Sequence, residues 1–124
     1  MNNDSNFNQS DLVGVMWTLT QFGSPAELKT AIGESFPNLF LHTDGHFTGN
    51  TGCNRFNGSF KVENTEMLFT AIAATKMMCA GQPGKLEQEQ TILKTLEGSG
   101  KFQLEKGLLT IFAADGSRVL IFKQ

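Results

Sequence analysis

The stretch Thr48–Phe60, TGNTGCNRFNGSF, decides how this chain folds. Glycines and asparagines interrupt residues that otherwise favour strands, namely Gly49, Gly52, Asn54, Asn57 and Gly58. Glycine inside a strand pattern marks a bulge, a bend or a close backbone approach, and both residue types accept positive φ angles. The pattern predicts a strand, a corner at Gly52-Cys53-Asn54 and a second strand. This corner is either a structural bend, which is common in β folds, or a binding loop.

Short strand-like segments lie on both sides of this corner. Upstream, apolar residues alternate at Val13, Val15, Trp17 and Leu19, which predicts a strand over residues 13–22. The same reasoning predicts further strands over residues 36–43, 46–50, 55–63, 67–73, 101–105, 108–113 and 117–123.

Glycine-containing dipeptides predict the turns between these strands, at Asp44-Gly45, Lys106-Gly107 and Asp115-Gly116. Asp44-Gly45 is typical of a two-residue type I′ hairpin, whose two central residues both need positive φ. Such a hairpin would place His42 diagonally from His46 on the neighbouring strand. Phe56 and Phe60 in the strand that follows are expected in the core.

Residues 85–97 form the best helix candidate. Leu86, Leu93 and Leu96 share one face, Gly98 ends the helix, and Glu87 and Glu89 are expected on a solvated face. Residues 23–35 leave two alternatives open, a short helix that begins at a Ser24 cap with Pro25 in its first position, or an excursion loop. The pattern predicts an α+β fold: a curved, mostly antiparallel sheet (a partial barrel) of about eight short strands with one main helix packed on it.

The composition indicates one domain. The chain has 124 residues, of which 40% are hydrophobic, with 11 phenylalanines and a net charge of −2. Its 10 basic residues are scattered, which argues against nucleic acid as a partner. No apolar run approaches the ~20 residues of a membrane span. The polar residues 1–11 predict a flexible tether ahead of a domain over residues 12–124, and they lack the apolar core of a signal peptide.

The two cysteines, Cys53 and Cys79, are either a disulfide or a pair of buried thiols. Together with His42 and His46 they would supply four zinc ligands, but their spacing does not support such a site, so no metal is expected. No nucleophile or phosphate-loop signature occurs, so neither catalytic residues nor a cofactor are expected.

If the corner is a site, the candidate binding residues are Asn54 and Arg55, with Lys76 nearby. Each has a plainer interpretation. Asn54 can hydrogen-bond the neighbouring backbone and merely hold the corner, and Arg55 can be a solvated strand residue.

The chain resembles the META domain family, and within it the HslJ type of heat-shock-inducible bacterial envelope protein. The matching residues are Trp17-Thr18-Leu19, the segments Phe36–Phe60, Ala74–Ala80 and Leu104–Phe122, and Glu89 in the helix. The run Gly52–Gly58 together with Thr75–Cys79 makes the resemblance specific. Lys76 stands where the family usually has arginine, and lysine lacks the bidentate donor geometry of arginine.

The resemblance implies a strongly curved sheet with one prominent helix. It also implies a non-catalytic stress protein that faces the periplasm, as a lipoprotein or exported protein with any lipid anchor upstream of residue 2. Related proteins are linked to novobiocin resistance. A Cys53–Cys79 disulfide is allowed in that compartment and is favoured there.

The expected partner is an envelope protein or a small hydrophobic ligand, and the expected state is a monomer. Two alternatives remain from other classes. One is a small thiol-dependent enzyme that uses Cys53 with Arg55 or Lys76. The other is a purely structural module of a secretion or envelope assembly.

Overall fold

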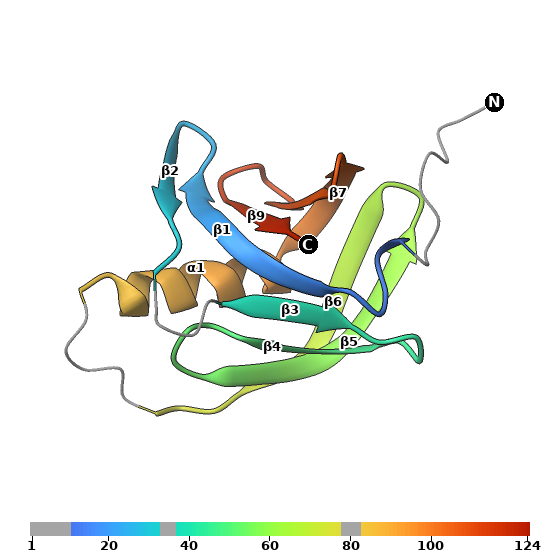
Figure 1. Ribbon diagram of the computed structural model, residues 1–124, viewed down its shortest axis with the longest axis horizontal. Helices are drawn as coiled ribbons and strands as arrows, with labels where there is room; N and C mark the ends of the chain where they lie inside the picture. Colours follow the sequence, from blue (N-terminus) through green and yellow to red (C-terminus); the bar gives the residue numbers. More distant parts are fainter. Residues whose placement is uncertain (1–10, 33–36, 78–82) are drawn as a thin grey trace.

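The computed structural model describes residues 11–32, 37–77 and 83–124 (Figure 1). The tether predicted for residues 1–11 lies outside this part of the chain, except for Asp11. The described residues form the strands β1 (Met16–Ser24), β2 (Glu27–Thr30), β3 (Asn38–Leu41), β4 (His46–Asn50), β5 (Arg55–Glu63), β6 (Glu66–Ala74), β7 (Ser99–Glu105), β8 (Leu108–Ala113) and β9 (Val119–Lys123), and the helix α1 (Lys85–Glu97).

The strands form a closed antiparallel barrel. Consecutive strands pair from β3 to β9, and β1 pairs with β3 at one edge and with β9 at the other, which closes the ring. Of the nine strands, β2 alone lies outside this ring, paired with β1. The antiparallel sheet with one helix is confirmed, whereas the predicted partial barrel is corrected to a closed one. The closure depends on the long β1, whose partner β9 lies at the other end of the chain.

The segment after β1 is a strand, so both the helix and the excursion loop expected there are wrong for its described residues. Ser24 pairs with Glu27 across a two-residue turn, and Gly23 pairs with Leu28. Pro25 therefore begins a turn rather than a helix. Gly23 permits this turn because its φ is +132° and a Cβ there would lie 2.8 Å from the carbonyl oxygen of Glu27.

Apolar side chains from all around the ring fill the barrel. Trp17 is completely buried, and its Nε1–H donates to the carbonyl oxygen of Leu12 at 2.9 Å. The phenylalanines pack edge to face, with the Phe47 and Phe69 rings 5.0 Å apart and nearly perpendicular. Phe56 and Phe60 are buried, as predicted. The core cluster also includes Leu19, Phe22, Leu39, Leu41, Met67, Ile92, Leu96, Phe102, Leu109, Ile111, Leu120 and Phe122.

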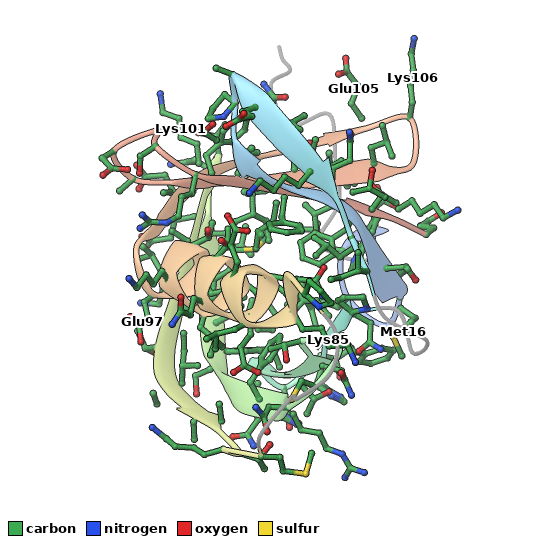
Figure 2. All side chains as sticks on the ribbon, turned by 90° about the vertical axis from the view of Figure 1, so that its left-hand side faces the viewer. Met16, Lys85, Glu97, Lys101, Glu105 and Lys106 are labelled. Atoms are coloured by element: carbon green, nitrogen blue, oxygen red, sulfur yellow. The ribbon has the colours of Figure 1, made fainter. Side chains whose placement is uncertain are left out.

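The helix α1 lies across one end of the barrel, between the β1, β8 and β9 side and β6 (Figure 2). Its buried residues are Gln88, Ile92, Thr95 and Leu96. The prediction that Leu86 belongs to the buried face is wrong, because 61% of this residue is exposed. Leu86 precedes Gln88 by two positions, which turns its side chain about 200° around the helix axis. Among the described residues, no helix is long and apolar enough to cross a membrane.

The loop between β3 and β4 differs from the predicted two-residue hairpin. The N–H of Gly45 donates to the His42 carbonyl at 3.2 Å, and the N–H of His42 donates to the His46 carbonyl at 2.9 Å. The loop therefore has three residues, of which only Gly45 has positive φ, at 93°. His42 lies directly opposite His46 rather than diagonally from it. The tight turn at Lys106-Gly107 is confirmed, with φ values of 54° and 79°.

Candidate functional site

The corner between β4 and β5 is closed by hydrogen bonds within five residues. The N–H of Thr51 donates to the Asn54 carbonyl at 2.8 Å, and the N–H of Asn54 donates to Thr51 Oγ1 at 2.9 Å. Gly52 takes a φ of +98° and donates its N–H to Asn50 Oδ1 at 2.6 Å. The asparagines and glycine of the motif therefore shape the corner itself.

Asn54 links this corner to two distant segments. Its Nδ2 donates to the Met77 carbonyl at 3.2 Å and to Glu89 Oε1 at 2.8 Å. Its Oδ1 accepts from Thr75 Oγ1 at 2.8 Å and from the Met77 N–H at 2.7 Å. The residue is 1% exposed. All four hydrogen-bonding positions of the amide are thus used inside the chain.

The helix supplies the other half of this arrangement. Gln88 is completely buried, and its Nε2 donates to the carbonyl oxygens of Thr51 at 2.9 Å and Ile32 at 3.0 Å. Its Oε1 accepts from the Ile32 N–H at 2.8 Å. Glu89 Oε1 also accepts from Thr51 Oγ1 at 2.7 Å. We call the residues Thr51, Asn54, Thr75, Gln88 and Glu89 the corner clasp.

Sequence reasoning missed Gln88 and was wrong about Glu89. The expectation of a solvated face holds for Glu87, which is exposed and pairs with Lys29 at 2.6 Å. It fails for Glu89, which is only partly exposed and accepts two hydrogen bonds from the corner. The one available signal was the position of Gln88, four residues before the apolar Ile92 on the same helix face.

The structure brings the three predicted binding residues into two adjoining segments. The N–H of Arg55 donates to Thr75 Oγ1, and the N–H of Thr75 donates to the Arg55 carbonyl, both at 3.0 Å. Arg55 and Lys76 are exposed, and so is 61% of Met77. The outer side of the corner clasp thus presents two cations beside a thioether. The binding role of Asn54, Arg55 and Lys76 stays a prediction.

Cys53 lies at the tip of the corner. Its N–H donates to Thr51 Oγ1 at 3.2 Å, and its Sγ lies 3.7 Å from the Met77 carbonyl oxygen. No described cysteine is a free thiol. Cys79 falls outside the described residues, so the Cys53–Cys79 disulfide stays a prediction.

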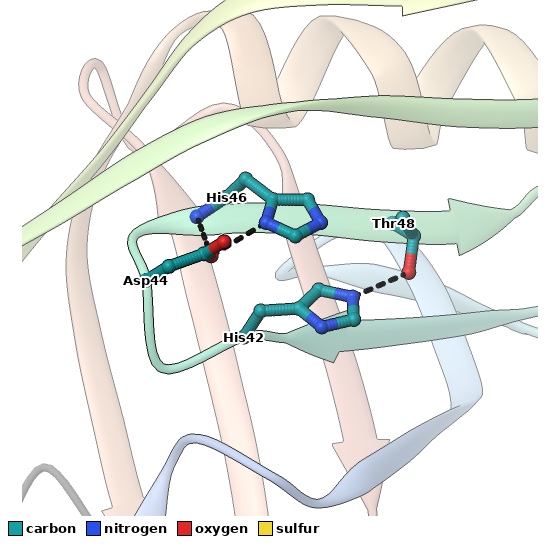
Figure 3. Close-up of polar contacts among 4 residues, drawn as sticks. All are labelled: His42, Asp44, His46 and Thr48. Atoms are coloured by element: carbon teal, nitrogen blue, oxygen red, sulfur yellow. Dashed lines mark hydrogen bonds and ion pairs between the residues drawn. The ribbon is translucent and has the colours of Figure 1, made fainter.

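The two histidines stack on the β3–β4 hairpin (Figure 3). Their ring centroids are 4.0 Å apart and the ring planes differ by 4°. His46 Nδ1 lies 2.5 Å from Asp44 Oδ1, and His42 Nε2 lies 3.1 Å from Thr48 Oγ1. The backbone N–H and the ring of His46 lower the pKa of Asp44.

This stacked pair is poorly arranged for a metal ion. The nitrogen lone pairs lie in two parallel ring planes and do not converge on one point. Among the described residues, no group of three or more His, Cys, Asp or Glu side chains could hold a metal.

A hollow of about 590 Å³ lies at the junction of β6, β7 and β8. We call it the seam hollow, because β6 and β7 are joined there by a single residue pair, Glu66 with Lys101. Lys101 and Gln103 alternate with buried Phe102 and so face outward. Phe112 and Ala114 line the hollow from the neighbouring strand and turn. Its volume is typical of a small-molecule site, and sequence reasoning missed it because its residues come from three separate segments.

Comparisons with known proteins agree on the family and on the fold. The family model described as the META domain matches residues 10–124. The heat shock protein HslJ of Escherichia coli (strain K12) is 37% identical over 62 residues, which cover 50% of this chain and 44% of HslJ. The match thus spans less than half the length of that relative.

Three solved structures share the fold. The NMR structure of a protein from Burkholderia xenovorans has a TM-score of 0.73 and 22% identity, covering 99% of this chain and 92% of that one. A second NMR structure has a TM-score of 0.73 and 27% identity, covering 94% of both chains. The crystal structure of a DUF4847 family protein from Bacteroides vulgatus ATCC 8482 has a TM-score of 0.66 and 13% identity, covering 93% of this chain and 95% of that one.

Proposed function

Because this chain belongs to the META domain family and is of the HslJ type, we propose that it is a non-catalytic, heat-shock-associated protein of the bacterial envelope. In this proposal it faces the periplasm as a lipoprotein or an exported protein. It binds a small hydrophobic ligand or an envelope protein and contributes in this way to novobiocin resistance. The name of the HslJ relative and the chemistry of the exposed surface support the proposal.

The observation that carries the binding function is the seam hollow. Phe112 offers an apolar aromatic surface, while exposed Lys101 supplies a cation at the same place. A flat apolar group is recognised by an aromatic side chain, and a lysine ammonium favours an anionic substituent on it. Glu66 lies opposite Lys101 and lines the same hollow, so its carboxylate offsets this charge preference, and the ligand class that fits is a small aromatic compound.

The test is a titration of the ¹⁵N-labelled protein with two probes, novobiocin and anilinonaphthalene sulfonate. We expect amide shifts to concentrate in residues 100–103 and 112–116. Lys101→Glu should weaken binding about fivefold, the size of one exposed charge interaction. Lys61→Glu is the matched control, since Lys61 is an exposed strand lysine outside the hollow. Shifts that avoid the hollow, or equal affinity in both variants, would contradict the proposed site.

A protein partner is the second part of the proposal, and the outer side of the corner clasp supports it. Asn54 holds the two segments together, while Arg55 and Lys76 present their charges to solvent. We expect this surface to select an acidic partner segment. Reversing both charges should abolish partner capture from a cross-linked envelope fraction, whereas Lys61→Glu should leave it intact. Capture that survives the double reversal would exclude this surface.

The compartment is tested through the cysteines. Native cells are treated with an alkylating reagent under denaturing, non-reducing conditions, and the intact protein is weighed. An unlabelled protein carries the Cys53–Cys79 disulfide and has been outside the cytosol. Two labels would contradict the envelope location and reopen the thiol-dependent alternative.

A further inference from the structure

One strand of the described chain, β2, lies outside the closed barrel. Within the described residues β2 pairs with β1 alone, and all four of its residues are exposed. Figure 1 shows β2 at the upper left, with no other strand along its outer edge. Closure of a barrel removes strand edges, but β2 lies outside the ring and retains an open edge.

The register shows which backbone groups face that open edge. The N–H of Ala31 donates to the Thr20 carbonyl at 2.9 Å, so Ala31 points its backbone groups toward β1. Successive residues of a strand point these groups to opposite edges. Glu27 and Lys29 therefore face β1, whereas Leu28 and Thr30 direct their N–H and C=O groups to the open edge.

Because the backbone groups alternate between the two edges, two copies can pair antiparallel about a two-fold axis only if the axis is centred on a residue of β2 and not between two residues. Centring the pair on Glu27 would bring Glu27 opposite Glu27 of the second copy. Centring it on Lys29 would bring two lysines together. Centring it on Leu28 brings Leu28 opposite Leu28 and Glu27 opposite Lys29 twice, so that each Lys29 ammonium lies between Glu87 of its own chain, at 2.6 Å, and Glu27 of the second copy. Centring it on Thr30 would bring Lys29 opposite Ala31, without a charge pair. Of these four registers, only the one centred on Leu28 pairs opposite charges, and like charges directly opposite are destabilising.

We propose that β2 is a self-complementary docking edge through which two copies of this chain form a two-fold dimer centred on Leu28. The interface covers Leu28, an apolar side chain that is 38% exposed in the single chain. The dimer continues the sheet by backbone hydrogen bonds, in the manner of strand addition. A strand of four residues buries little area, so the dimer is weak and depends on concentration. This inference departs from the monomer expected from the sequence, and it does not rest on the proposed ligand.

The decisive experiment is disulfide trapping with single substitutions in the full chain. In the proposed register the two Leu28 Cα atoms lie about 5.5 Å apart, which suits a disulfide. L28C should form a covalent dimer under mild oxidation, with the link between the two introduced thiols identified by mass spectrometry. T30C is the matched control, because the two Thr30 positions would lie about 13 Å apart along the pair. Both residues are exposed, and native fluorescence of Trp17 confirms that the variants fold.

A second measurement tests the charges. E27K in the L28C background places like charges opposite each other and should slow trapping about threefold at low ionic strength. The proposal is supported if L28C forms the covalent dimer, T30C does not, and E27K slows the trapping of L28C. Absence of a dimer up to about 1 mM protein, equal trapping of L28C and T30C, or indifference to E27K would each overturn it.

Discussion

Replacing Asn54 by alanine is the most direct test of the corner clasp. The substitution removes four side-chain hydrogen bonds from a residue that is 1% exposed. Each neutral bond contributes about 1 kcal/mol net, and the bond to the Glu89 carboxylate about 2 kcal/mol. The sum is about 5 kcal/mol.

Water recovers part of this loss. Thr75 and Met77 are exposed, so their freed groups can hydrate once the amide is gone. Glu89 Oε1 also keeps its bond from Thr51. We therefore expect Asn54→Ala to lower the free energy of unfolding by about 3 kcal/mol, which corresponds to a fall of about 10 °C in Tm for a domain of this size.

Urea unfolding followed by the fluorescence of Trp17 measures this change. Trp17 is the single tryptophan and is completely buried, so its signal reports the loss of the core. Asn57→Ala is the matched control, since Asn57 lies in β5, three residues after Asn54, with its side chain exposed. It should change stability by no more than about 0.5 kcal/mol.

Asn54→Asp separates the hydrogen bonds from packing, because it keeps the size of the side chain. The introduced carboxylate would face Glu89 Oε1 and the Met77 carbonyl without a donor. Asn54→Asp should therefore lower the free energy of unfolding more near pH 7, where the carboxylate is charged, than near pH 4. A loss below about 1 kcal/mol for Asn54→Ala, equal to that of Asn57→Ala, would refute the clasp as a source of stability.

Three further substitutions test the surrounding geometry. Gln88→Leu should cost about 2 kcal/mol in urea unfolding, because it leaves the backbone groups of Ile32 and the Thr51 carbonyl without their partner. Gly52→Ala should lower Tm more than Gly45→Ala: both glycines have positive φ, but a Cβ at Gly52 lies 3.0 Å from Gln88 Nε2 and one at Gly45 meets nothing within 4 Å. The pKa of Asp44 is lowered in the folded state, so its stabilisation is present above the ordinary pKa of 3.8 and is lost as pH falls through the folded value. Asp44→Asn should therefore flatten the fall of Tm on acidification below pH 3.8, and an unchanged pH profile would show that the Asp44 contacts do not stabilise the hairpin.

Local sequence patterns were sufficient where each element depends on its own residues. The alternation of Trp17 and Leu19, the helix over residues 85–97 and the turn at Lys106-Gly107 were all predicted correctly. The turn at Asp44-Gly45 was predicted at the correct position, but its loop has three residues instead of the predicted two. Both loop lengths suit an Asp-Gly pair, and the choice between them depends on the register of β3 against β4.

Tertiary structure alone decided the closure of the barrel and the partners of the clasp. The pairing of β1 with β9 joins residues 18–23 to residues 119–123, and no local pattern encodes a contact across that separation. Gln88 and Glu89 looked like ordinary polar helix residues, because a sequence shows the hydrogen-bonding capacity of a side chain but not the group that satisfies it. Their partners at Thr51 and Asn54 come within reach only when the helix crosses the end of the closed barrel.

The sequence by itself therefore determined the elements of this protein other than β2, its META-type resemblance and the corner at residues 52–54. Backbone propensities and the alternation of apolar residues act over a few positions and can be recognised there. The folded chain decided which of those elements meet, which left β2 as an open edge and gathered the seam hollow from three segments. Those outcomes depend on packing and strand register across the whole barrel, which short-range propensities do not specify.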